Sequence, residues 1–137
     1  FSTTLMFGQR RPDKEKIKSL KVAYITERLN LKSSEAQAFW PIYNAHEQQM
    51  ESYREQERFE IYGKLKDMES LSDQETETLL KDLITLESQK NAANQQFLKD
   101  IQKVISAKKT FLLLKTENGF KRRLLQQYRQ KQGGGLR

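Results

Sequence analysis

The fold of this chain is decided by residues 33–68, SSEAQAFWPIYNAHEQQMESYREQERFEIYGKLKDM, which contain one proline and one glycine in 36 residues. The apolar side chains of this stretch recur in steps of three and four, which places them on one face of a helix. They are Phe39, Tyr43, His46, Met50 and Tyr53, with the histidine lying within the row. A single helix over the whole stretch would be about 50 Å long. Because that length exceeds a compact globule of 137 residues, the stretch predicts an elongated all-α protein.

A shorter helix is predicted before this stretch, over Asp13–Leu29. Pro12 precedes it and acidic residues occupy its first turn, which are both signals of a helix start. Residues 30–32 break the apolar pattern, and the long helix follows at once. Ser34 and Gln37 have the spacing of a capping box, in which two side chains satisfy the first free backbone amides.

Two features inside the long helix are expected to shape it. Pro41 lacks the amide that would bond the carbonyl of Gln37, so the axis should bend there. Trp40 and Tyr43 flank this bend, and we expect it to fix how the first helix packs against the second. Gly63 is a modest weakness, which costs up to about 1 kcal/mol relative to alanine.

Two more helices are predicted after the long one. Ser72 and Glu75 form a second capping box, and the third helix then runs to about Ile105. Ser106 caps the fourth helix, which Gly119 is expected to interrupt. The apolar rows are Leu79, Leu83, Leu86, Lys90, Ala93, Phe97, Ile101 and Val104 in the third helix, and Phe111, Leu114, Phe120, Leu124 and Tyr128 in the fourth.

The composition fits an ordered amphipathic protein. The chain is 36% hydrophobic and 31% charged, and its apolar residues fall in periodic rows, which favours order over disorder. It has no cysteine, which excludes disulfides and thiolate metal sites. We expect residues 10–131 to form a single all-α domain and the glycine-rich residues 132–137 to form a flexible tail.

The net charge of +7 is unevenly distributed along the chain. Residues 121–137 carry six basic side chains and no acid, whereas residues 67–87 carry seven acids and one base. Such a pattern suits self-association or acidic partners at the ends, and its simpler interpretation is a solvated face. The basic end could bind nucleic acid or acidic lipid, but the acidic middle and the predicted export signal argue against such a binder.

The N-terminal residues 1–9, FSTTLMFGQ, differ from the rest because they carry no charge. Arg10 and Arg11 follow them directly. We interpret the stretch as the end of a signal peptide with processing near Gly8–Gln9, and a disordered N-terminus is the alternative. No other apolar stretch is long enough to span a membrane.

The residues give no basis for a catalytic, cofactor or metal site, so we do not expect an enzyme. His46 and Glu47 begin like a zinc-protease helix, but Met50 stands where the second histidine ligand would be. His46 is interpreted as a packed or interface residue, with a ligand or pH-sensitive group as the alternative. The serines gather at helix starts, where capping explains them.

The residues at the two helix breaks resemble a known family. Leu71-Ser72-Asp73-Gln74-Glu75 resembles the Leu-Thr-x-x-Gln motif of the Spy/CpxP-like envelope proteins, and residues 31–37 are similar to a second copy with Lys32 in place of a hydroxyl. The blocks KVAYITERLNLKSSEAQAFWPIYN, LSDQE and ISAKKTFLLLKTENGFKRRLL resemble the periplasmic sensor-like branch of Bacteroidetes-type bacteria, over roughly residues 14–127. The positions that carry the resemblance are Leu31, Ser34, Gln37, Phe39, Trp40, Pro41, Tyr43, Leu71, Ser72 and Glu75.

The resemblance implies a periplasmic all-α protein of four helices in long helical hairpins, assembled as a cradle-shaped antiparallel homodimer. Some such proteins are ATP-independent chaperones of unfolded or aggregation-prone envelope proteins. Others are sensors or accessory proteins of two-component or extracytoplasmic sigma-factor signalling that act with a membrane-bound stress sensor. Metal-sensing relatives use histidine-rich or cysteine-containing sites, which this chain lacks. We therefore expect a chaperone, with the signalling role as the alternative.

A chaperone of this kind needs a broad, shallow surface that mixes aromatic and basic side chains. Apolar groups hold an unfolded segment weakly, while charge raises the rate of encounter. For the aromatic residues, the alternative is the core of a dimer or hairpin. The candidate client-binding residues are Tyr53, Arg54, Arg58, Phe59, Tyr62, Lys64, Lys66 and Phe97.

Overall fold

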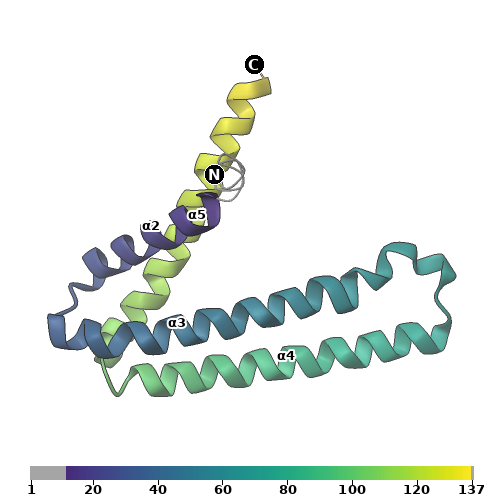
Figure 1. Cartoon of the computed structure of the whole chain (residues 1–137), viewed down its shortest axis with the longest axis horizontal. Coiled ribbons are helices and arrows are strands. Elements are labelled where there is room, and N and C mark those ends of the chain that lie inside the picture. Colours follow the sequence, from purple (N-terminus) through teal and green to yellow (C-terminus); the bar gives the residue numbers. More distant parts are fainter. Residues whose placement is uncertain (1–11, 137) are drawn as a thin grey trace, which may run out of the picture. The chain divides into compact units, whose positions relative to one another are not determined.

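The computed structural model describes residues 12–136, and within this range the chain is helical with no strand (Figure 1). The all-α prediction is therefore confirmed for the described residues, whereas the expected signal-peptide remnant lies outside them. The elements are α2 (Pro12–Leu29), α3 (Ser33–Gln56), the π-helix η1 (Glu57–Tyr62), the 3-10 helix η2 (Lys64–Ser70), α4 (Asp73–Ile101) and α5 (Ala107–Leu136).

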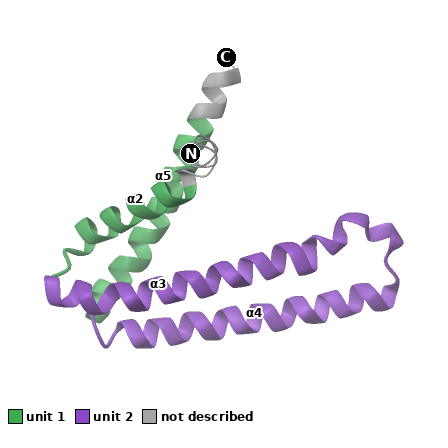
Figure 2. Cartoon of the chain, viewed as in Figure 1, with its two compact units in different colours: residues 1–32, 106–137 green, residues 33–105 purple. Residues whose placement is uncertain are grey.

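The helices belong to two compact units (Figure 2). Unit 1 comprises residues 1–32 and 106–137 and contains α2 and α5. Unit 2 comprises residues 33–105 and contains α3, η1, η2 and α4.

In unit 2, α3 and α4 pack side by side and run antiparallel (Figure 2). Near one end the rings of Tyr43 and Phe97 lie 6.2 Å apart, and further along Lys90 lies 3.7 Å from the carboxylate of Glu57. Phe39 is fully buried, with its ring 4.8 Å from that of Trp40. The apolar rows predicted for these two helices are confirmed, because their buried members are Phe39, Tyr43, Leu79, Leu86, Phe97 and Ile101.

The long helix predicted over residues 33–68 is wrong in its last third. The α-helix ends at Gln56, the chain then winds into the wider η1, and η2 contains the non-helical Asp67 at φ −114° and ψ 62°. At the junction the amide of Gly63 donates to the carbonyl oxygen of Arg58, five residues earlier, at 2.7 Å. This i to i−5 bond is the mark of a π-turn, which interrupts an α-helix.

Gly63 makes that junction possible, and we expect Gly63→Ala to destabilise the protein. A Cβ at this position would lie 2.7 Å from the carbonyl oxygen of Phe59, a backbone atom that cannot move without shifting the turn. In an ordinary helix, replacing glycine by alanine raises the free energy of unfolding by up to about 1 kcal/mol. Here we expect the free energy of unfolding to fall by about 1 kcal/mol instead. Urea denaturation followed by circular dichroism measures it. A gain in stability would contradict the π-turn.

In unit 1, α2 and α5 pack against each other. The rings of Tyr24 and Phe120 lie 5.5 Å apart, and Lys21 forms an ion pair with Glu117 at 3.5 Å. Asn30 ends α2 in the left-handed region at φ 49°, a conformation that asparagine tolerates better than most residues. The predicted break at residues 30–32 is thus confirmed.

The apolar row predicted for α5 is wrong at both ends, because Phe111 and Leu114 near its start and Tyr128 near its end are exposed. Phe111 is 73% exposed and Leu114 is 36% exposed, whereas Leu113 is fully buried. The buried side of the helix includes Thr110, whose hydroxyl donates to the carbonyl oxygen of Ser106 at 2.9 Å. Because that bond satisfies the hydroxyl, the threonine can occupy a buried position, and the packed face is rotated away from Phe111.

Gly119 does not interrupt the fourth helix, contrary to the prediction, because α5 is continuous from Ala107 to Leu136. A Cβ at Gly119 would lie 3.5 Å from the hydroxyl of Tyr24, an ordinary contact distance. The helix also extends across residues 132–136, for which the composition predicted a flexible tail. The predicted cap is confirmed, since the amide of Lys109 donates to Ser106 Oγ at 3.1 Å.

Candidate functional site

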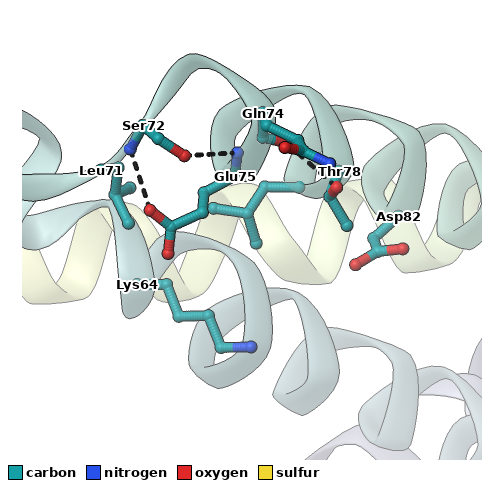
Figure 3. A pocket seen from close by; sticks show the side chains of 8 residues that line it. Lys64, Leu71, Ser72, Gln74, Glu75, Thr78 and Asp82 are labelled. Atoms are coloured by element: carbon teal, nitrogen blue, oxygen red, sulfur yellow. Dashed lines mark hydrogen bonds between the residues drawn. The ribbon is translucent and has the colours of Figure 1, made fainter.

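The LSDQE segment forms the start of α4, and its capping box is confirmed. The amide of Glu75 donates to Ser72 Oγ at 3.1 Å, and the amide of Ser72 donates to Glu75 Oε1 at 2.9 Å (Figure 3). The backbone hydrogen bond from Ser72 is the main reason why the pKa of Glu75 lies below its ordinary value, with the Ser72 side chain adding to it. The motif that suggested the family is therefore a structural cap, and its residues fix where α4 begins.

A shallow hollow lies beside this cap (Figure 3). Lys64 of η2 and Glu75 and Asp82 of α4 contribute its charged side chains, and Leu71 and Thr78 line it as well. Lys64 of η2 therefore lies beside the start of α4.

Large apolar side chains are exposed where α3 gives way to η1 and η2. Phe59 is 67% exposed, Tyr62 is 51% exposed and Met68 is 57% exposed. The guanidinium of Arg58 lies 5.1 Å from the centre of the Phe59 ring, which is within cation–π distance. The other aromatic residues of unit 2 are buried or half-buried, so the exposed aromatic rings of this unit all lie at this turn.

The structure brings most of the candidate client-binding residues together at this turn. Tyr53 is half-buried, and the exposed Arg54 pairs with Glu51 at 2.9 Å, which neutralises part of its charge. Phe97 is only 6% exposed and belongs to the core of unit 2, which was the alternative interpretation for the aromatic residues. We call the exposed group the turn cluster, which consists of Arg58, Phe59, Tyr62, Lys64, Lys66 and Met68.

Met68 was missed by the sequence reasoning. It lies outside the apolar row of α3, and nothing in its position along a regular helix marked it as exposed. In the structure, the non-helical Asp67 of η2 lies just before Met68, so the helical periodicity of α3 does not extend to this residue.

His46 is a packed residue. Its ring stacks on that of Phe97 with the centroids 4.1 Å apart and the planes 13° from parallel. Among the described residues, no group of three or more histidine, aspartate or glutamate side chains is placed to hold a metal ion.

The two units differ in net charge. Residues 1–32 and 106–137 carry 17 basic and 4 acidic side chains, whereas residues 33–105 carry 8 basic and 14 acidic ones. Unit 1 is therefore strongly basic and unit 2 is acidic. Within the described part of the chain, every helix is too short or too polar to cross a membrane.

No protein-family model matches this chain, and neither a curated protein nor a solved structure matches it. The resemblance to Spy/CpxP-like proteins is carried by the quoted residues alone. The function is consequently argued from the surface of the molecule, and above all from the turn cluster.

Proposed function

We propose that this protein binds unfolded or aggregation-prone proteins as an ATP-independent chaperone of the bacterial periplasm. The observation that carries the proposal is the turn cluster, where Phe59, Tyr62 and Met68 are exposed beside cationic side chains. Exposed apolar surface costs about 25 cal/mol for each Å² left in water. Contiguous exposed apolar side chains of this kind are typical of interaction sites.

The chemistry of the cluster suits weak and general binding. The aromatic rings offer apolar area to any unfolded segment, and residues 57–69 mix three basic with four acidic side chains, so basic and acidic stretches of a client both meet opposite charges there. The surface is open, and the hollow beside it is shallow, so a bound segment leaves without a nucleotide-driven step. The π-turn bond from Gly63 to Arg58 lies within this surface, and the capping box at Ser72 follows it in the chain.

The proposal includes an antiparallel homodimer, as the family resemblance implies. Leu80 is 57% exposed and Ile84 is 61% exposed, and they lie one turn apart on α4. These side chains supply an apolar surface that a second copy could cover.

The decisive test replaces both aromatic residues of the turn cluster, in the double variant Phe59→Ser with Tyr62→Ser. A denatured client is diluted into buffer without ATP, and its aggregation is followed by light scattering. The natural protein should suppress scattering at a few-fold excess, and the variant should need about tenfold more protein, because it loses most of the exposed aromatic area. Both side chains are more than half exposed, so the fold should be retained.

The matched control is Phe111→Ser with Leu125→Ser, which removes similar exposed apolar area from unit 1. This control should suppress aggregation as well as the natural protein does. The proposal fails if the natural protein does not suppress aggregation, or if the two double variants lose activity equally.

A further inference from the structure

The outer face of α5 combines exposed apolar and basic side chains. The inner face is the one that meets α2, through Phe120 and through the ion pair of Glu117 with Lys21. Phe111 and Leu125 point elsewhere and are 73% and 51% exposed. We define the outer face by its charged and large apolar residues, which recur in steps of three, four and seven: Lys108, Phe111, Leu114, Lys115, Lys121, Arg122, Leu125 and Arg129, all of them exposed. The exposed and uncharged Asn118 lies among them.

No acidic side chain interrupts this outer face. The only acid in α5 is Glu117, which lies on the inner face and pairs with Lys21 of α2 at 3.5 Å. Five of the eight residues on the outer face are cationic, and three are large and apolar. The whole unit reinforces this charge, since it carries 17 basic and 4 acidic side chains.

We propose that the outer face of α5 binds an anionic lipid surface, with the helix lying in the plane of the membrane. Amphipathic helices bind in this way when cationic residues flank an apolar stripe, because the apolar groups enter the boundary of the acyl chains while the cations meet the headgroups. The long aliphatic stems of the lysines and arginines let their charged ends reach the headgroups while the ring of Phe111 enters the lipid. At about 45 Å, α5 is long enough to place all eight residues on the surface.

The apolar residues favour lipid over nucleic acid as the partner. A phosphate backbone is neutralised by the cations alone, and it makes no use of an exposed Phe111, Leu114 and Leu125 in line with them. A lipid surface uses both kinds of group. The proposal does not depend on the turn cluster, which belongs to unit 2.

Vesicle flotation with the full chain tests the proposal. Vesicles of phosphatidylcholine and phosphatidylglycerol in equal parts should carry the protein to the top of the gradient, whereas vesicles of phosphatidylcholine alone should not. The double variant Arg122→Glu with Arg129→Glu should partition about 20-fold or more weakly, because each cation near such a surface contributes about fivefold. The matched control, Lys16→Glu with Lys18→Glu on α2, makes the same change of charge in exposed residues of the same unit.

The apolar part of the face is tested separately with Phe111→Ser and Leu125→Ser in one chain. This variant keeps every charge, and it should lose about tenfold in partitioning. The variant Phe59→Ser with Tyr62→Ser should float like the natural protein, which separates this proposal from the chaperone function. Circular dichroism of each variant checks that the helices are retained.

Three results would overturn the proposal. The first is failure of the natural protein to float with the anionic vesicles, and the second is a loss of binding in the α2 control as large as that in the α5 variant. The third result has three parts. Binding falls in the Arg122→Glu with Arg129→Glu variant, stays unchanged when Phe111 and Leu125 are replaced, and is abolished by competing duplex DNA. That third result would identify a general polyanion site.

Discussion

Replacing Phe39 by alanine is expected to lower the free energy of unfolding by about 3–5 kcal/mol. The side chain is fully buried, and its ring lies 4.8 Å from Trp40 and 5.5 Å from Tyr43, so the change removes a well-packed ring and leaves a cavity. Trp40 is the only tryptophan in the chain and lies in the same unit. Urea denaturation followed by tryptophan fluorescence therefore measures the effect where it arises.

Phe59→Ala provides the matched control, since it removes the same ring from a position that is 67% exposed. Its effect should stay below about 1 kcal/mol, because the ring is exposed and the change leaves the backbone of η1 unaltered. Equal losses at Phe39 and Phe59 would contradict the division of the aromatic residues into core and surface.

The second large effect is expected in unit 1, at Leu113. This side chain is fully buried, and its replacement by alanine should cost about 2–5 kcal/mol. The comparison with Leu114→Ala is informative, because the sequence pattern predicted Leu114 for the packed row and the structure leaves it 36% exposed. We expect the Leu114 change to cost less than about 1.5 kcal/mol. Thermal unfolding followed by circular dichroism measures both.

If Leu114→Ala proves the more damaging of the two, the rotation of α5 about its own axis is different from that described. The outer face would then be the packed face. This result would also remove the basis for lipid binding by Phe111 and Leu125.

The starts of α4 and α5 could be predicted because their caps depend on short-range chemistry. Ser72 and Glu75 satisfy each other's amides within four residues, and Ser106 bonds the amide of Lys109 three residues later. The apolar rows of α3 and α4 were also predictable, because both follow helical spacing over several turns and pack on each other.

The turn between α3 and α4 could not be predicted, because a π-turn leaves almost no trace in sequence. Gly63 reads as an ordinary weak point of a helix, and only the backbone shows that its amide reaches Arg58. The packed face of α5 was missed for a different reason. Thr110 is polar in a sequence pattern but satisfies its hydroxyl within its own helix, so it can be buried in place of Phe111.

The sequence predicted the types of residue in the candidate site, but only some of the individual residues. Phe59 and Phe97 are equivalent in a sequence, since both are aromatic residues on predicted helices with charged neighbours. Their surroundings differ, because Phe97 lies on α4 against Tyr43 and His46 of α3, whereas Phe59 lies in η1, after α3 has ended. Helical periodicity carries no information on the turn that exposes Phe59 and Tyr62.

Site-specific photocrosslinking tests the central claim most directly. A photoreactive phenylalanine analogue is placed at position 59, or at position 111 as the control, and the protein is irradiated while an unfolded client is present without ATP. Efficient crosslinks to the client from position 59, and few from position 111, are the predicted result. Crosslinks mainly from position 111, or none from position 59, would contradict the claim that the turn cluster binds unfolded chains.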